Sequence, residues 1–263
     1  MAAELQDWQG LVHGRSDQSA ALVVELPLEP SPRGGSGTFL AVVSDQQRWW
    51  VKPQNNLQGP RVIVTESIVG RAGELIDAPV CEVTVVRIPE ELAGWEFRPG
   101  AKLEAGLAHA SLAIEDALEV GQLHYRERDD NRRRHAGVFA LYDWWWGADD
   151  QWLHCESDDR KIYSHDHGMY LPGGPSWDEA SLSAQADTPH QPAYATNGLD
   201  PDALAGFAGR LEALSRDDLV ALVSAIPASW SASDRDFEAL GFFLERRAPA
   251  VAARLRALKG GAP

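Results

Sequence analysis

The sequence has little cysteine, no long apolar run and a shortage of basic residues. Its two cysteines, Cys81 and Cys155, stand far apart and lack the C-x-x-C spacing of a zinc knuckle. We therefore expect both to be small buried residues in a reducing environment. No apolar run approaches the roughly 18 residues of a membrane span, and the opening MAAELQDWQG lacks the basic and apolar blocks of a secretion signal. These absences predict a cytoplasmic protein that does not associate with a membrane.

The shortage of basic residues limits the partners that the surface can bind. Asp and Glu number 39 against 24 Lys and Arg, which gives a formal net charge of −15. A surface of this sign repels polyanions, and the basic run Arg132–Arg134 is too short for a broad nucleic-acid footprint. With 44% hydrophobic residues over 263 positions, the chain can fill a sizeable core. We expect a globular protein with two lobes or two small domains.

Strand signals dominate the first part of the chain. The runs Phe39–Val43 and Arg48–Lys52 flank the polar turn SDQQ, which predicts a β-hairpin ending at Lys52. After the loop PQNNLQGP, apolar residues recur at helical spacing and predict a helix that ends near Asp77. These residues are Val64, Ile68, Ala72 and Leu75. The run CEVTVVRI then predicts another strand, so this part of the chain is strand-rich.

Helical signals dominate the last part of the chain. Residues 176–197 mix Ser, Ala, Asp, Pro and His without periodicity, and we interpret them as a loop or a linker. Beyond them, Asp200 before Pro201 and Ser215 before Asp218 predict two capped helices. A third helix is predicted by Phe237, Leu240, Phe243 and Leu244. Strands first and helices last predict an α+β fold.

Charged residues occur in an order that suits phosphoryl transfer. Lys52 ends a strand, and Glu66 lies on the next helix. Farther along, Asp149 precedes the strand-like runs QWLHC and KIYSH, and Asp166 follows them. A triphosphate carries dense negative charge, so its transfer needs a lysine to orient it and an aspartate to hold magnesium. Asp149 would orient the attacking hydroxyl, and His154, five residues later, occupies the place of a second metal ligand. This order indicates an ATP-dependent phosphotransferase.

Two segments of the sequence resemble the small HipA-like kinases. They are WWVKPQNNLQGPRVIVTESIVGRAGELIDAPV, around Lys52 and Glu66, and HDHGMYL, around Asp166. The segment SAIPASW in the C-terminal third is similar to that family as well. The resemblance implies a bilobal protein-kinase-like fold. Its strand-rich N-terminal lobe would comprise residues 1–95, and its mostly helical C-terminal lobe residues 96–263.

The same resemblance implies an activity and its ligands. The protein would bind ATP and Mg²⁺, with Mn²⁺ as an alternative metal. It would transfer the γ-phosphate to a hydroxyl of a protein or of a small molecule. By this resemblance Lys52 contacts the ATP phosphates, Glu66 holds Lys52, and Asp166 binds the metal.

The segment GADDQWLH departs from the family pattern. Asp149 is kept, but Asp150 stands where the family has a basic residue, and His154 stands where it has an asparagine metal ligand. Imidazole nitrogen is a softer ligand than the oxygen that magnesium prefers. The departures therefore leave a second function open, that of a pseudokinase or nucleotide-binding regulator without turnover.

Two loops are candidates for cradling the phosphates. The glycine-rich RGGSGT precedes Phe39, and NNLQG follows Lys52 with Asn55 and Gln58 as its polar side chains. Glycine-rich backbone and Asn or Gln amides can both supply N–H donors to a phosphate. The sequence does not choose between them.

His165 and His167 are also compatible with a metal hydrolase. A His-x-His pair of this kind usually opens a long βα barrel with further His and Asp ligands downstream. Here His190 alone among the histidines follows, and the remaining chain is too short and too helical for such a barrel. The sequence therefore favours the phosphotransferase.

Overall fold

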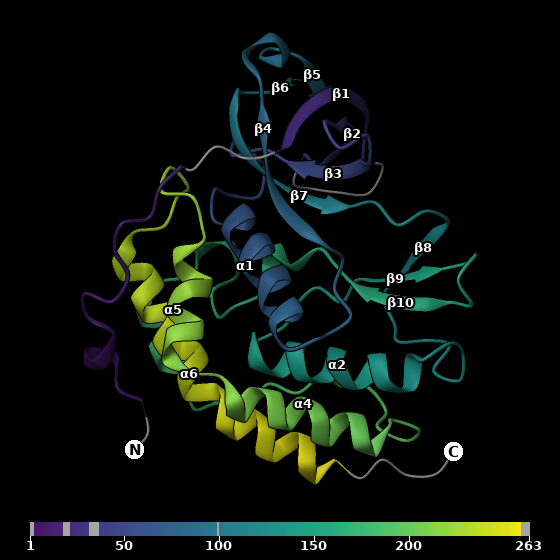
Figure 1. The fold of residues 1–263 in the computed structure, drawn as a ribbon, viewed down its shortest axis with the longest axis vertical. Helices are drawn as coiled ribbons and strands as arrows, with labels where there is room; N and C mark the ends of the chain where they lie inside the picture. Colours follow the sequence, from purple (N-terminus) through teal and green to yellow (C-terminus); the bar gives the residue numbers. More distant parts are fainter. Residues whose placement is uncertain (1–2, 18–21, 32–36, 99, 259–263) are drawn as a thin grey trace.

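Figure 1 shows two lobes, with the strands of the N-terminal lobe above and the helices of the C-terminal lobe below. This computed structural model describes residues 3–17, 22–31, 37–98 and 100–258. The 3₁₀ turn η1, Leu5–Trp8, packs against the long helix α6, Asp234–Ala257, of the C-terminal lobe. The predicted α+β organisation is confirmed, because the strand-rich part of the chain precedes the mostly helical part.

The N-terminal lobe is a closed barrel in the strand order β1-β2-β3-β7-β4. Its strands are β1 Leu22–Pro30, β2 Phe39–Val43, β3 Arg48–Lys52, β4 Val83–Ile88 and β7 Gly106–Leu112. The predicted hairpin of β2 and β3 is confirmed, with Phe39 opposite Val51. Because side chains alternate along a strand, Trp49 and Val51 fill the barrel core while Trp50 and Lys52 line a cavity below it.

The barrel extends past residue 95, where the resemblance set the boundary between the lobes. Strand β7 pairs with both β3 and β4, so it is an integral part of the barrel. The turn η2, Glu90–Leu92, and the pair of short strands β5, Glu96–Arg98, and β6, Ala101–Lys102, lie between β4 and β7. The N-terminal sheet therefore ends at the C-terminus of β7.

Helix α1, Val62–Leu75, lies between the lobes and carries Glu66 (Figure 1). It confirms the helix predicted after the hairpin. Most of its residues are buried, on every side of the helix, and a glycine permits its close approach to β4. A Cβ added at Gly70 would lie 2.6 Å from Cγ1 of Val83. Dense packing on all sides fixes α1, and with it Glu66, against both lobes.

A three-stranded antiparallel sheet follows the barrel in the order β10-β9-β8. Its strands are β8 Ala117–Val120, β9 Trp152–Cys155 and β10 Lys161–Ser164. The predicted strand-like runs QWLHC and KIYSH are confirmed as β9 and β10. Helix α2, Asn131–Trp144, was not predicted, because arginines fill its first turn and its later residues are buried on nearly all faces. No single apolar stripe marks such a helix in the sequence.

Besides α2 and α6, the described part of the C-terminal lobe contains three α-helices. They are α3 Glu179–Gln185, α4 Pro201–Ala213 and α5 Arg216–Ser224. Both predicted caps are confirmed: the Asp200 carboxylate accepts the N–H groups of Asp202 and Ala203, and the Ser215 hydroxyl accepts that of Asp218. Local capping signals therefore located these helix starts correctly.

The prediction of a loop throughout residues 176–197 is wrong for α3. Asp178 caps this helix by accepting the N–H of Ser181. A helix of seven residues is too short to show apolar periodicity, so only its cap marked it. The 3₁₀ turns η3, His167–Met169, and η4, Gly174–Ser176, connect β10 to α3.

Both cysteines are buried and free, as predicted. The described residues form three apolar clusters: one inside the barrel, a larger one that joins α1 to the C-terminal helices, and a small one of Val138, Trp152 and Ile162. Within the described part of the chain, no helix combines the length and the apolar character needed to cross a membrane.

Candidate active site

A cavity of about 760 Å³ lies between the barrel and the three-stranded sheet. This volume is typical of small-molecule sites. The apolar part of the lining consists of Trp50, Leu112, Ile114, Ala117, Leu118 and Leu153. The polar part includes Lys52, Gln58, Glu66, His109, Glu119, Asp149, Asp150, Gln151, His165 and Asp166. Most of the predicted site residues therefore line one cavity.

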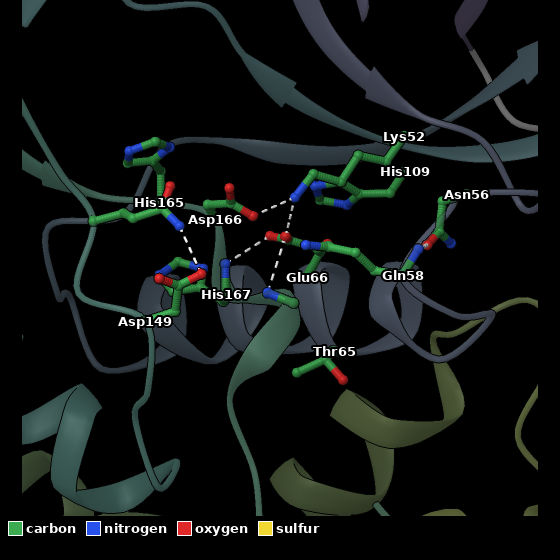
Figure 2. Close-up of polar contacts among 12 residues, drawn as sticks. Lys52, Asn56, Gln58, Thr65, Glu66, His109, Asp149, His165, Asp166 and His167 are labelled. Atoms are coloured by element: carbon green, nitrogen blue, oxygen red, sulfur yellow. Dashed lines mark hydrogen bonds and ion pairs between the residues drawn. The ribbon is translucent and has the colours of Figure 1, made fainter. Parts of the chain in front are cut away.

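The ammonium group of Lys52 forms ion pairs with Glu66 and Asp166 (Figure 2). Strand β3 supplies Lys52, helix α1 supplies Glu66, and the turn after β10 supplies Asp166. The side chains of Lys52 and Glu66 are 7% and 4% exposed, whereas that of Asp166 is 27% exposed. Asp166 is therefore the carboxylate of this cluster that is more open to the cavity.

Burial and ion pairing act in opposite directions on these three groups. Burial acts to lower the pKa of Lys52, but the carboxylates of Glu66 and Asp166 raise it above its ordinary value. Burial raises the pKa of Glu66 to about 7, with Lys52 opposing the rise. Burial also acts to raise the pKa of Asp166, but Lys52 lowers it well below its ordinary value. At neutral pH Lys52 and Asp166 are charged, and Glu66 is the group that can take up a proton.

Glu66 also holds the turn that follows Asp166. Its carboxylate accepts hydrogen bonds from the backbone N–H groups of His167 and Gly168, each at 2.9 Å (Figure 2). A Cβ added at Gly168 would lie 2.6 Å from Cγ1 of Val62, so glycine is needed for this close approach to α1. The Asp-His-Gly segment is thus bonded directly to the helix that carries Glu66.

The loop before β9 brings two oxygen donors to the cavity. Asp149 has an exposed side chain and a left-handed φ of 57°. The Nε2 group of Gln151 donates to Oδ2 of Asp149 at 2.9 Å. Both residues line the cavity together with Asp166. Carboxylate and amide oxygens are the hard donors that magnesium prefers, so the donor set fits this metal.

The structure does not bring His154 into the cavity. The side chain of Leu153, its neighbour on β9, lines the cavity, so that of His154 lies on the opposite face of the strand. There His154 is buried against Tyr125, with ring centroids 5.2 Å apart, and burial lowers its pKa. The geometry does not support His154 as a metal ligand. Gln151, two residues after Asp149, lies at the cavity instead.

The loop NNLQG borders the cavity through Gln58, whose side chain lines it. Asn55 is not part of the lining, because its Nδ2 group donates to the carbonyl oxygen of Lys102 at 2.8 Å. The Oδ1 atom of Asn56 accepts the backbone N–H of Gln58 at 3.1 Å. Asn55 and Asn56 therefore shape the loop, and Gln58 faces the space.

The loop RGGSGT lies largely in residues 32–36, outside the described residues. On either side of that segment, Ser31 and Thr38 both line the cavity. The two ends of the connection between β1 and β2 therefore border the same space as Gln58.

His165 and His167 occupy different environments. His167 is buried, and its Nε2 atom shares a hydrogen bond of 2.8 Å with the Ser164 hydroxyl. His165 lies at the cavity wall, 3.9 Å from a carboxylate oxygen of Glu119. Burial lowers the pKa of His165 to about 4 and that of His167 to about 3. Across the described ranges, no three His, Cys, Asp or Glu side chains are grouped to hold a metal ion.

His109 and Gln151 were not identified from the sequence. His109 lies opposite Lys52 in the pairing of β7 with β3, and Figure 2 shows the two side chains next to each other. Its Nδ1 atom shares a hydrogen bond of 2.8 Å with the Ser67 hydroxyl. Burial and the charge of Lys52 lower the pKa of His109 far below its ordinary value, so its ring is neutral. The alternation of side chains along the run GLAHASL was the sequence signal that could have identified the position of His109.

Known proteins match both the fold and part of the sequence. The chain is similar in structure to the proinflammatory kinase CtkA of Helicobacter pylori, with a TM-score of 0.56 and 13% sequence identity. The match covers 88% of this chain and 96% of that chain, and it shows a kinase-like fold. No curated protein matches the sequence. The family model described as HipA-like kinase matches residues 24–163, more than half of the chain. The chain therefore belongs to the HipA-like kinase family.

Proposed function

We propose that this protein transfers the γ-phosphate of ATP to a hydroxyl group, as a HipA-like protein kinase. The observation that carries the proposal is the contact of Lys52 with both Glu66 and Asp166 at the cavity. An ammonium group held by two carboxylates from separate segments has a defined position. Catalysis of phosphoryl transfer depends mainly on such positioning and on charge stabilisation.

The two parts of the cavity lining suit the two parts of ATP. Apolar residues such as Leu118 and Leu153 offer surfaces to the nucleobase, and Lys52 offers a positive charge to the phosphates. Gln58 is placed to donate to the phosphates as well. Asn55 would support this contact indirectly by bracing the loop against Lys102.

Asp166 and Gln151 would hold Mg²⁺, or Mn²⁺ in its place, with phosphate oxygens completing the ligand set. When bound, the metal neutralises charge on the transferring phosphate. Asp149 would accept a hydrogen bond from the attacking hydroxyl and take up its proton. Glu66 keeps Lys52 and the Asp166 turn in one arrangement through its bonds to both.

A second candidate function is nucleotide binding without transfer. It is favoured by Asp150, which adds a negative charge to the cavity lining where the family pattern has a positive one.

The test of both functions uses the wild-type protein with ATP labelled on the γ-phosphate and with Mg²⁺ or Mn²⁺. ADP release with label on a protein hydroxyl, or on an added small-molecule hydroxyl, supports transfer. Calorimetric ATP binding without ADP release supports the regulator, and the absence of ATP binding contradicts both.

Gln151 and His154 can be distinguished by substitution. Gln151→Ala should lower transfer about tenfold and raise the Mg²⁺ concentration needed for half-maximal rate, because a hard oxygen donor is lost. His154→Asn should leave the metal requirement unchanged, since this side chain lies on the other face of β9. Titration of the ADP-release rate with Mg²⁺ and Mn²⁺ measures both effects. A changed metal preference in His154→Asn alone would contradict the assignment of Gln151.

A further inference from the structure

The segment from His190 to Tyr194 packs against the loop that carries Asp149. The sequence alone marked this segment as part of a loop or linker. It contacts the loop before β9 at two points, one on each side of Asp149, through His190 and Tyr194. Neither side chain takes part in the ion pairs of Lys52 with Glu66 and Asp166.

The first contact point is Gly147, two residues before Asp149. The Nε2 group of His190 donates to the carbonyl oxygen of Gly147 at 2.6 Å. The imidazole ring is stacked on Trp146, with centroids 4.2 Å apart and planes 14° apart. Its other neighbour is Tyr142, at 5.5 Å and 3°. The hydrogen bond to Gly147 and the stacking on Trp146 therefore hold the start of the loop to His190, and the stacking on Tyr142 holds the ring to α2.

The second contact point is Asp150, directly after Asp149. The hydroxyl of Tyr194 donates to Oδ2 of Asp150 and accepts a hydrogen bond from Nε1 of Trp152 at 3.3 Å. The same hydroxyl lies 3.3 Å from the carbonyl oxygen of Gly121, just beyond β8. One phenol group therefore ties the end of the loop to the strand on the other side of the sheet.

The backbone of this loop requires such support. Asp149 adopts a left-handed φ of 57°, which is uncommon for a residue other than glycine. A Cβ added at Gly147 would lie 2.3 Å from Cδ2 of Tyr142, so the loop also approaches α2 closely. The side chain of Asp149 is exposed, with Gln151 as its hydrogen-bond partner. A strained backbone with an exposed side chain keeps one geometry only when its surroundings hold it.

We infer that His190 and Tyr194 are positioning residues, which hold Asp149 and Gln151 in the geometry needed for phosphoryl transfer. The inference rests on the proposed function. It also assigns a role to Asp150: this residue replaces the basic residue of the family pattern and serves as the acceptor through which Tyr194 holds the loop. Both ends of the loop are then held by side chains, and the chemistry is left to Asp149.

Tyr194→Phe tests the inference by removing one hydroxyl. We expect kcat for ADP release to fall about tenfold, with KM for ATP within twofold of the wild type, because the nucleotide contacts of Lys52 are untouched. Amide hydrogen exchange should become faster in residues 146–152 and stay unchanged in β10. Tyr163→Phe is the matched control, since Tyr163 is a partly buried tyrosine on β10 that does not line the cavity.

Asp150 provides the second arm of the experiment. Asp150→Ala should reproduce the loss of kcat, and Asp150→Asn, which keeps an acceptor oxygen, should restore most of it. The double variant of Asp150→Ala with Tyr194→Phe should lose less than the product of the two single effects, because both variants remove the contact between Tyr194 and Asp150. Additive losses, or equal changes in kcat and KM, would overturn the inference.

The remaining outcomes separate the inference from the proposed function. If the wild type transfers phosphate and Tyr194→Phe has the same kcat, the inference is overturned and the proposed function stands. If the wild type binds ATP but transfers no phosphate, the proposed function fails. Hydrogen exchange then decides the positioning role: faster exchange of residues 146–152 in Tyr194→Phe supports it, and unchanged exchange overturns it.

Discussion

Replacing Asp166 with asparagine is expected to lower magnesium-dependent phosphoryl transfer by about a thousandfold. Asparagine keeps the shape of the side chain but removes the negative charge that would hold the metal and that pairs with Lys52. The fold should survive, because the Asp166 side chain is 27% exposed and Lys52 keeps Glu66 as a partner. Calorimetric titration with ATP should show that Mg²⁺ no longer increases the affinity.

Asp158→Asn is the matched control for this prediction. It makes the same chemical change in the turn between β9 and β10, where Asp158 is 52% exposed and pairs with Lys161 at 3.0 Å. Exposed pairs of this kind contribute little to stability, so we expect wild-type binding and transfer. If Asp166→Asn also kept the magnesium dependence of the wild type, the metal would be held elsewhere and the proposed site would be incorrect.

The order of Lys52, Glu66 and Asp166 could be predicted because each residue follows from a local signal. The hairpin pattern set the end of β3, the helical spacing set α1, and the two short apolar runs set the end of β10. A strand end and a helix face determine where a side chain points, so these three could be expected to meet. The structure brings their side chains together in ion pairs.

The assignment of His154 shows the limit of counting residues along a motif. The spacing of five residues after Asp149 assumes that the intervening chain stays in a loop. Here β9 begins at Trp152, so the fifth residue lies on a strand and on its far face. Alternation within the strand, rather than spacing from Asp149, decides which residues reach the cavity. Gln151, the last residue before the strand, therefore lies at the cavity, whereas His154 does not.

Long-range packing explains the other omissions. Helix α2 has no apolar stripe because it is covered on nearly all sides, and the segment from His190 to Tyr194 has no periodicity because it follows the surface of a loop. Such segments are specified by contacts with residues distant in sequence. Local propensity and periodicity carry no information on these contacts.

Replacing Lys52 with methionine is the prediction with the second largest effect. Methionine fills similar space without the charge, so the phosphates lose their cation and ATP affinity should fall at least about tenfold. The buried carboxylate of Glu66 also loses its partner, which should lower the free energy of unfolding by about 3 kcal/mol near neutral pH. Lys102→Met is the control, because Lys102 is an exposed lysine on β6 that contacts Asn55 through its backbone carbonyl and not through its side chain. It should bind ATP and unfold like the wild type.

The stability of Lys52→Met should also depend on pH in a defined direction. The pKa of Glu66 in the folded protein is already raised to about 7 by burial, and loss of Lys52 raises it further. A raised pKa means that the folded state binds a proton that the unfolded state releases. The stabilisation from this proton is lost as the pH rises through the pKa of the folded state. The free energy of unfolding of Lys52→Met should therefore fall by roughly 1.4 kcal/mol per pH unit between pH 6 and 8. In the wild type, the fall in the free energy of unfolding should level off above pH 7.

Denaturant titrations of both proteins at pH 6, 7 and 8 measure this difference. If the free energy of unfolding changed with pH in the same way in the two proteins, Lys52 would not control the ionisation of Glu66.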